Sequence, residues 1–135
     1  MYGAPAGCLL LARSRQTVLG CVGVRALSKR DCEVKRGCEM KRDCEMKRLY
    51  VREVARGRSL GRTLARRAIE WASGAGYHRI CLDTLPDMSA AQRLYAQLGF
   101  LPIEPYYRTP LSGTLFMALD LIGPRSLNRS LNPIQ

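Results

Sequence analysis

The residues best suited to chemistry stand in one short basic segment, Arg56-Gly57-Arg58-Ser59-Leu60-Gly61-Arg62. It follows a stretch with strand character and opens a stretch with helical periodicity. The first turn of a helix leaves backbone N–H groups without partners, and the helix dipole is positive there. Glycines let a backbone approach a ligand closely, and arginines add charge-assisted hydrogen bonds. The segment therefore predicts an anion site that suits a pyrophosphate, with an ordinary strand-to-helix turn as the alternative.

The charge of the whole chain also favours anionic partners. Its 135 residues carry a formal net charge of +11, which is typical of proteins that meet phosphate ligands, nucleic acid or acidic lipid. No apolar run approaches the ~20 residues of a membrane span. No basic region precedes the first apolar run, so we expect a cytoplasmic protein without a membrane partner. The six cysteines and the one histidine form no metal-binding pattern.

Residue patterns predict the elements that position this segment. Helices are expected over 59–73, with Ser59 as N-cap and Gly74 or Gly76 as the stop, and over 88–98, ended by Gly99. Strands are expected over 7–13, 17–27, 78–83, 100–104 and 114–121, with a longer strand that ends at Val51. The order predicts a single α/β domain over residues 1–122, a mixed sheet with helices packed on it. Residues 123–135 lack periodicity, and we expect a flexible tail there.

Residues 29–46 hold three near-identical hexamers, which read KRDCEV, KRGCEM and KRDCEM. Strand side chains alternate with period two, so an even repeat presents the same faces in every copy. Cys44 and Met46 would share one side of the strand, and Glu45 would lie on the other. The preceding strand pairs with only about its own length. We therefore expect the third copy, Asp43 to Met46, in the sheet and the first copy in a hairpin or loop.

Two stretches resemble the GNAT superfamily of N-acetyltransferases, namely CEMKRLYVREVARGRSLGRTL and LDTLPDMSAAQRLYAQLGF. In that family the loop pattern is Arg/Gln-x-x-Gly-x-Gly/Ala, and it wraps the pyrophosphate of coenzyme A. Here the pattern is Arg56-x-x-Ser59-x-Gly61, so a serine replaces the middle glycine. The second signature, Ala91-x-x-Leu94-Tyr95-x-x-x-Gly99-Phe100, is intact. The resemblance covers roughly residues 7–121 and implies a mixed, mostly antiparallel central sheet flanked by helices.

The resemblance implies acetyl-coenzyme A as the co-substrate. Its pyrophosphate would lie on residues 56–62, and its pantetheine arm would pair with the backbone of Leu49, Tyr50 and Val51. Backbone amides in that stretch would also polarise the thioester carbonyl. Met88 stands where many members have asparagine, so we expect one pantetheine contact to be lost.

The resemblance also implies two catalytic residues. Tyr95 matches the tyrosine that protonates the departing thiolate, and a phenol with a pKa of about 10 is protonated at neutral pH. The alternative for Tyr95 is a packing residue with a polar tip. Glu45 matches the position of a general base, and the alternative is a solvated carboxylate paired with Lys47 or Lys41.

The chain departs from the family pattern at its beginning. Family members usually start with a strand and one or two helices before the strand expected at residue 7, and these elements border the acceptor site. Only Met1 to Ala6 precede that strand here. We therefore expect an N-terminal truncation that exposes a sheet edge and favours a homo-oligomer.

Three functions remain open at this point. The first is an N-acetyltransferase whose acceptor, a small-molecule or peptide amine, attacks directly in a ternary complex; Tyr106 and Tyr107 would line its pocket or merely pack. The second is a non-catalytic coenzyme A-binding or oligomerising domain. The third, a nucleic-acid-binding module, is weaker because no aromatic platform interleaves the arginines. Binding of acetyl-coenzyme A and release of thiol with amines would separate the first two.

Overall fold

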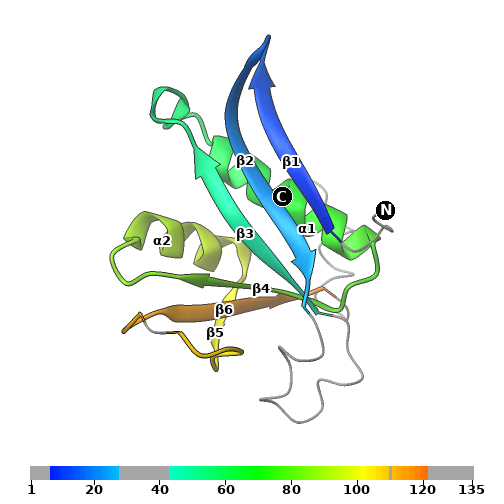
Figure 1. Ribbon diagram of the computed structural model, residues 1–135, viewed down its shortest axis with the longest axis vertical. Helices are drawn as coiled ribbons and strands as arrows, with labels where there is room; N and C mark the ends of the chain where they lie inside the picture. Colours follow the sequence, from blue (N-terminus) through cyan, green and yellow to red (C-terminus); the bar gives the residue numbers. More distant parts are fainter. Residues whose placement is uncertain (1–6, 28–42, 110, 122–135) are drawn as a thin grey trace.

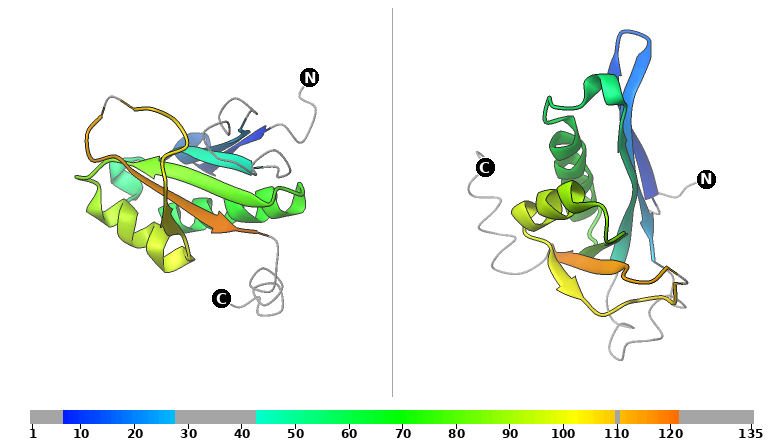
Figure 2. Two further views of the ribbon diagram at one scale, coloured as in Figure 1. Left: turned by 90° about the horizontal axis from the view of Figure 1, so that it is seen from below. Right: turned by 90° about the vertical axis from the view of Figure 1, so that its left-hand side faces the viewer.

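The computed structural model describes residues 7–27, 43–109 and 111–121. They form a six-stranded sheet in the order β1-β2-β3-β4-β6-β5, with the two α-helices on one side of it (Figures 1 and 2). The strands are β1 Gly7–Ser14, β2 Thr17–Ala26, β3 Asp43–Val51, β4 Arg79–Thr84, β5 Leu101–Ile103 and β6 Leu115–Asp120. The helices are α1 Leu60–Gly74, α2 Ser89–Leu98 and a short 3-10 helix, Glu53–Ala55.

The predicted fold class is confirmed. The sheet is mixed because β3 and β4 run parallel, whereas the other four strand pairs of the described chain are antiparallel. No helix among the described residues is long and apolar enough to cross a membrane. The first two hexamers and the tail predicted over 123–135 lie outside the described residues.

The described part of the third hexamer, Asp43 to Met46, lies in the sheet as predicted. Ala26 pairs with Cys44 and Val24 with Met46, and the amide of Leu27 donates to the carbonyl of Asp43 at 2.9 Å. Cys44 and Met46 pack with the helices in the main core. Glu45 faces the other side, toward Tyr106. The alternation of strand side chains therefore holds for this copy.

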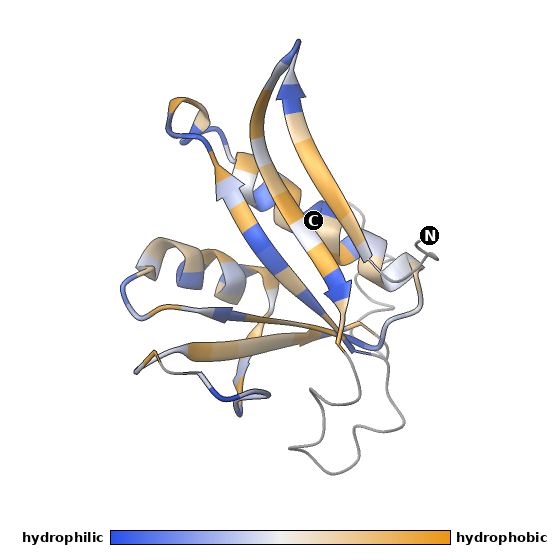
Figure 3. Cartoon of the chain, viewed as in Figure 1, coloured by the Kyte–Doolittle hydropathy of each residue, from blue (hydrophilic) through white to orange (hydrophobic). Residues whose placement is uncertain are grey.

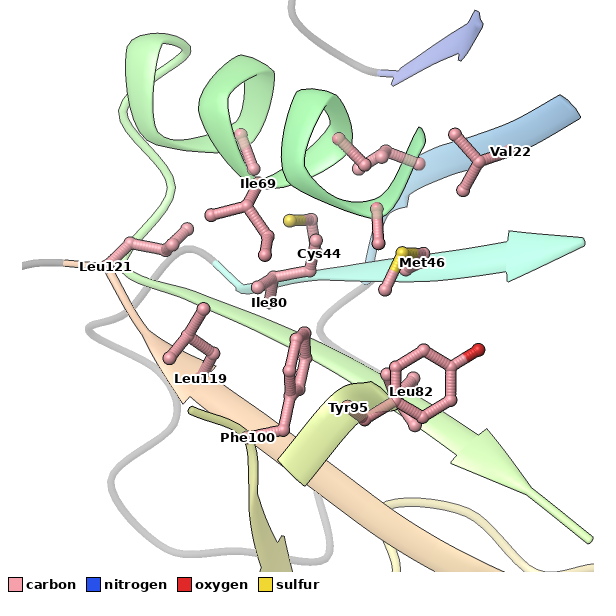
Figure 4. Packing of buried hydrophobic residues seen from close by; sticks show 14 of the residues in the cluster. Val22, Cys44, Met46, Ile69, Ile80, Leu82, Tyr95, Phe100, Leu119 and Leu121 are labelled. Atoms are coloured by element: carbon pink, nitrogen blue, oxygen red, sulfur yellow. The ribbon is translucent and has the colours of Figure 1, made fainter. Parts of the chain in front are cut away.

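Two apolar clusters hold the sheet in place. The larger cluster lies between the sheet and the helices and includes Ile69, Ile80 and Leu82 (Figure 4). The buried face of α1 recurs at helical spacing and comprises Leu64, Ala65, Ala68, Ile69 and Ala72. The smaller cluster lies on the opposite side of the sheet and comprises Cys81, Tyr106, Phe116 and Ala118. Each large aliphatic or aromatic side chain buried in these clusters contributes about 1.5–3 kcal/mol.

A bulge interrupts the pairing of β2 with β3. Cys21 is opposite Tyr50 and Gly23 is opposite Lys47, so that β3 has two residues where β2 has one. Arg48 takes a left-handed conformation there, with φ of 60°, and its carbonyl oxygen accepts a hydrogen bond from the Cys21 thiol at 3.4 Å. Bulges of this kind bend a strand and re-aim its side chains. Beyond it, Leu49 packs toward the main core while Tyr50 is exposed.

The predicted helix ends lie where expected, but the capping hydrogen bond expected from Ser59 is not formed. α1 begins after Ser59, as expected, yet Ser59 has a φ of 60° and its side chain makes no capping hydrogen bond. The predicted serine cap is therefore wrong as a hydrogen bond, because the left-handed backbone replaces the extended conformation in which a capping oxygen reaches the first turn. α2 ends at Gly99, whose φ of 104° suits a glycine C-cap.

Candidate functional site

The site begins where β3 and β4 part. They pair only at Asp43↔Arg79, Cys44↔Ile80 and Glu45↔Cys81. Beyond this point β3 continues beside β2 and β4 continues beside β6, so that the two strands open into a V (Figure 1). From Met46 onward the β4-facing edge of β3 has no strand partner among the described residues. An exposed strand edge of this kind can bind an extended ligand through main-chain hydrogen bonds.

The free edge of β3 leads directly into the basic turn. At the start of α1 the Thr63 amide donates to the Ser59 carbonyl at 3.1 Å. Within the described chain, the amides of residues 57–62 have no backbone acceptor. Gly57, with φ of 87°, and Ser59 supply the left-handed conformations that turn the chain. Unpaired amides and the positive end of the helix dipole therefore coincide in this turn, and such an arrangement suits an anion.

The arginines of this turn are not equivalent. The Arg56 Nε donates to the Val51 carbonyl at 2.8 Å, and its guanidinium carbon lies 5.7 Å from the centroid of the Tyr50 ring. Arg62 donates to the Gln97 side chain and so joins α1 to α2. Arg58 is exposed and has no hydrogen bond within the described chain. Arg56 and Arg62 therefore brace the turn, while Arg58 is available to a ligand.

Gly61 occupies a place that sequence reasoning did not foresee. A Cβ added to it would meet Val51 Cγ2 at 3.8 Å and Leu94 Cδ2 at 4.0 Å, which are ordinary van der Waals contacts. A side chain here would thus point between β3, α1 and α2. Gly61 keeps this space between the elements clear, in addition to its place in the turn.

Tyr95 packs on the helix side of the sheet. Its ring lies near Leu82, and its ring centroid is 5.7 Å from that of Phe100. The residue is 8% exposed. Its hydroxyl points out of the cluster, toward the side on which β3 and β4 separate (Figure 4). Burial raises the pKa of Tyr95, and the charge of Asp83 raises it further. The phenol therefore stays protonated at neutral pH and can donate its proton.

Glu45 lies on the opposite side of the sheet and is fully buried. Its Oε1 accepts from the Arg25 Nε and lies 2.9 Å from an outer nitrogen of the same guanidinium. Its Oε2 accepts from the Tyr106 hydroxyl at 2.5 Å, a short charge-assisted bond. The Lys47 ammonium is farther, at 3.9 Å. The alternative is therefore wrong about solvation, because Tyr106 from the segment between β5 and β6 covers the carboxylate, but right about the pairing with Lys47.

A second carboxylate, Asp83, was not singled out in the sequence. It lies on β4 and accepts a hydrogen bond from the Tyr107 hydroxyl. The rings of Tyr106, Tyr107 and Phe116 pack edge to face with centroids 5.1–5.5 Å apart. Burial, followed by the bonds to Glu45 and Asp83, raises the pKa of both tyrosines. The one signal in the sequence is that Asp83 follows the buried Cys81 by two residues on a strand, where side chains two apart share a face.

Comparison with known proteins decides the family. The model of the acetyltransferase (GNAT) family matches residues 1–100. The chain belongs to the GNAT family of acetyltransferases. An uncharacterized N-acetyltransferase of Schizosaccharomyces pombe is 40% identical over 122 residues, which cover 89% of this chain and 68% of that relative.

Solved structures agree with this GNAT assignment. A Klebsiella pneumoniae protein named as an acyl-CoA N-acyltransferase superposes with a TM-score of 0.70 at 26% identity, covering 87% of this chain and 74% of that chain. An acetyltransferase of Salmonella typhimurium, solved with acetyl-CoA, superposes with a TM-score of 0.63 at 22% identity, covering 84% of this chain and 64% of that chain. GNAT acetyltransferases use acetyl-coenzyme A, so this is the co-substrate that the family membership brings.

In this GNAT chain the predicted site residues fall into three groups. Leu49, Tyr50 and Val51 lie on the free edge of β3, and residues 56–62 form the turn at its end. Tyr95 and Glu45 lie on opposite sides of the sheet. The positive φ of Ser59 explains why a glycine stands at this place in the family loop pattern, since glycine adopts that conformation at no steric cost.

Proposed function

We propose that the protein transfers the acetyl group of acetyl-coenzyme A to a primary amine, which attacks directly in a ternary complex. One observation carries the proposal, namely the free edge of β3 that opens away from β4 and ends in the basic turn. An extended pantetheine arm can pair with Leu49–Val51, and a pyrophosphate can meet the amides of residues 57–62. Both parts of the donor are thus served by one continuous stretch of backbone.

The bulge at Arg48 supports the position of the thioester. It lies at the first part of β3 that has left β4. A bulge turns backbone amides out of the ladder, and amides aimed at the thioester oxygen would stabilise the negative charge that develops during attack. The Cys21 thiol holds the Arg48 carbonyl and so helps to set this backbone.

Two side chains carry the proton transfers in the proposed reaction. The acceptor nitrogen bonds to the acetyl carbon as the carbon–sulfur bond breaks, and Tyr95 gives its proton to the departing thiolate. The proton lost by the amine passes to Glu45. Because the carboxylate is fully buried, Glu45 would receive it through the hydroxyl of Tyr106, to which its Oε2 is bonded.

Binding is tested by calorimetry with acetyl-coenzyme A. Arg58→Glu reverses a charge beside the unpaired amides and should weaken binding at least tenfold, which is about 1.4 kcal/mol. Arg67→Glu is the matched control, because it makes the same charge change at an exposed position farther along α1. If both variants lose affinity equally, the turn is not the pyrophosphate site.

Turnover is tested by release of free thiol from acetyl-coenzyme A in the presence of amines. Tyr95→Phe should lower turnover by about 100-fold or more, with little change in affinity for the donor. Glu45→Gln should also lower turnover. Its effect should shrink as the pH rises, because a larger fraction of the amine is then already deprotonated. If Tyr95→Phe and the wild type turn over equally, Tyr95 has no part in the proton transfer.

The alternative function is a coenzyme A-binding domain that oligomerises without catalysis. One observation favours it. β1 is an end strand of the sheet, and Leu9 and Leu11 on it are 62% and 46% exposed. An apolar end strand invites pairing with another chain. Sedimentation of the wild type and of Leu9→Lys would detect a homo-oligomer, and tight donor binding without thiol release would favour this alternative.

A further inference from the structure

Asp83 borders the opening between the diverging strands. β3 accompanies β4 only as far as Cys81, so Asp83, two residues later, has no β3 neighbour. On its other side it stands opposite Phe116 of β6. Tyr107 reaches it from the segment between β5 and β6. Three separate elements, β4, β6 and the segment that carries Tyr107, thus hold this carboxylate where β4 has left β3.

The charge of Asp83 lacks the compensation that the other two carboxylates of this region have. Asp43 is paired with Arg79 at 2.9 Å, and Glu45 is paired with Arg25 at 2.9 Å. No lysine or arginine of residues 7–27, 43–109 and 111–121 forms an ion pair with Asp83. This is notable in a chain with 22 lysines and arginines. Among the described residues, the donor to its Oδ2 is the neutral hydroxyl of Tyr107.

The second oxygen of Asp83 is available. Its Oδ1 makes no hydrogen bond within the described chain, and it is not among the buried polar atoms without a partner, so it is open to solvent. The Tyr107 side chain, whose hydroxyl bonds Oδ2, is itself only half-buried, whereas the neighbouring Phe116 is buried. Aromatic rings attract cations through their negative faces, so the Tyr107 ring can add to the attraction of the carboxylate.

We propose that Asp83, with the hydroxyl and ring of Tyr107, binds the protonated amino group of the acceptor, so that the acceptors are cationic primary amines. The inference rests on the proposed acetyl transfer. An alkylamine resembles the lysine side chain, whose pKa is about 10.4, and therefore arrives as an ammonium ion at neutral pH. It supplies the cation that Asp83 lacks.

The position of Asp83 also connects the acceptor to the donor. Leu82, the residue before Asp83 on β4, packs in the main core with Tyr95 (Figure 4), and the charge of Asp83 contributes to the raised pKa of Tyr95. An amine held at Asp83 would therefore have to reach the thioester and the phenol across the opening between β3 and β4. The bound ammonium gives up one proton to water, which frees the lone pair of its nitrogen for attack. The second proton, lost on attack, can pass to Glu45 through Tyr106, which is bonded to Glu45 and packs against Tyr107 with centroids 5.5 Å apart.

The test is a calorimetric titration of amines into protein saturated with coenzyme A, which allows binding without reaction. The probes are n-hexylamine, a diaminobutane and a hexapeptide with a free amino terminus, each compared with its N-acetylated form. Asp83→Asn removes the charge but keeps an oxygen for Tyr107. Asp83→Glu keeps the charge. Asp120→Asn is the matched control, because it removes a carboxylate from the opposite, exposed end of the β4–β6 ladder.

We expect at least one free amine to bind, its acetylated form to bind at least tenfold more weakly, and Asp83→Asn to weaken the free amine at least tenfold. Asp83→Glu should recover part of the affinity, and Asp120→Asn should match the wild type. The inference is overturned if none of the amines binds, if the acetylated forms bind as well, or if Asp83→Asn has no effect. Two additional titrations separate the two proposals, one of coenzyme A into the free protein and one of the amines without coenzyme A. Failure to bind coenzyme A would refute acetyl transfer, while the effect of Asp83→Asn on amine binding could still be read.

Discussion

Ser59→Gly should stabilise the protein, although it removes a side chain from the functional turn. Ser59 has a φ of 60° and makes no capping hydrogen bond. A residue with a Cβ pays about 1–2 kcal/mol for the left-handed conformation, and glycine avoids that strain. Glycine also loses more chain entropy on folding, which offsets about 0.4–1 kcal/mol of this stabilisation. The net expectation is a gain of about 1 kcal/mol.

The measurement is the urea midpoint of unfolding at neutral pH, with the slope checked for constancy between variants. A gain of this size corresponds to a rise of about 4 °C in the melting temperature. Ser59→Ala is the first control, because it removes the hydroxyl but keeps a Cβ at the same φ, and it should give no gain. Gly57→Ala is the second control. Its φ is 87°, and an added Cβ would meet nothing within 4 Å, so its expected loss of about 1 kcal/mol comes from the backbone alone.

The outcome that refutes this reasoning is specific. If Ser59→Ala stabilises as much as Ser59→Gly, the hydroxyl and not the backbone is the source of the cost. If Gly57→Ala is neutral while Ser59→Gly has no effect, the turn does not hold its left-handed conformations in solution.

Three further predictions concern the packing and titration of the same region. Tyr106→Phe removes a charge-assisted bond to the buried Glu45 and should lower the free energy of unfolding in urea by about 1.5–3 kcal/mol. Tyr107→Phe should cost less, because water can replace the lost hydroxyl at the half-buried Asp83. Equal losses in the two variants would contradict this. The raised pKa of Tyr95, Tyr106 and Tyr107 means that above a pH of about 10 the unfolded state binds fewer protons than the folded state. The contribution of these tyrosines to the free energy of unfolding should therefore be constant below that pH and fall above it, by at most about 1.4 kcal/mol per pH unit for each tyrosine. Tyr106→Phe should make the fall shallower, and an equal slope in the variant would argue against the contribution of Tyr106. Gly20→Ala would place a Cβ 2.8 Å from the Tyr50 carbonyl oxygen and 3.1 Å from a Leu64 methyl. β2 must therefore move, at a cost of about 1–3 kcal/mol. Gly23→Ala is the control and should cost less, because its added Cβ would be 3.5 Å from the nearest atom.

Much of the local structure was predictable because it depends on near neighbours in the chain. The spacing of Leu64, Ala68 and Ala72 predicts the buried face of α1, and Gly99 predicts the end of α2. The register of the third hexamer copy was predictable as well. The unique residues after it must reach the turn, and a strand can pair only along its own length.

The contacts of Glu45 could not be predicted in the same way. A charged strand residue beside lysines is usually solvated, and its neighbours in sequence favoured that interpretation. Its actual partners, Arg25 and Tyr106, lie 20 and 61 residues away. Only the return of the chain after β5 brings Tyr106 over β3 and turns a surface position into a buried one.

The sequence by itself determined the family, the order of the elements and the basic turn, because these are carried by short motifs and by local periodicity. Only the tertiary structure decided which residues meet around the opening. The pairing of β3 with β4 stops at Glu45 and Cys81, and no local pattern marks that point, because it results from the different partners that each strand follows afterwards. The same long-range arrangement left Asp83 with a tyrosine and no cation in the described chain. Charge compensation depends on distance in space, and distance in space is set by the whole fold.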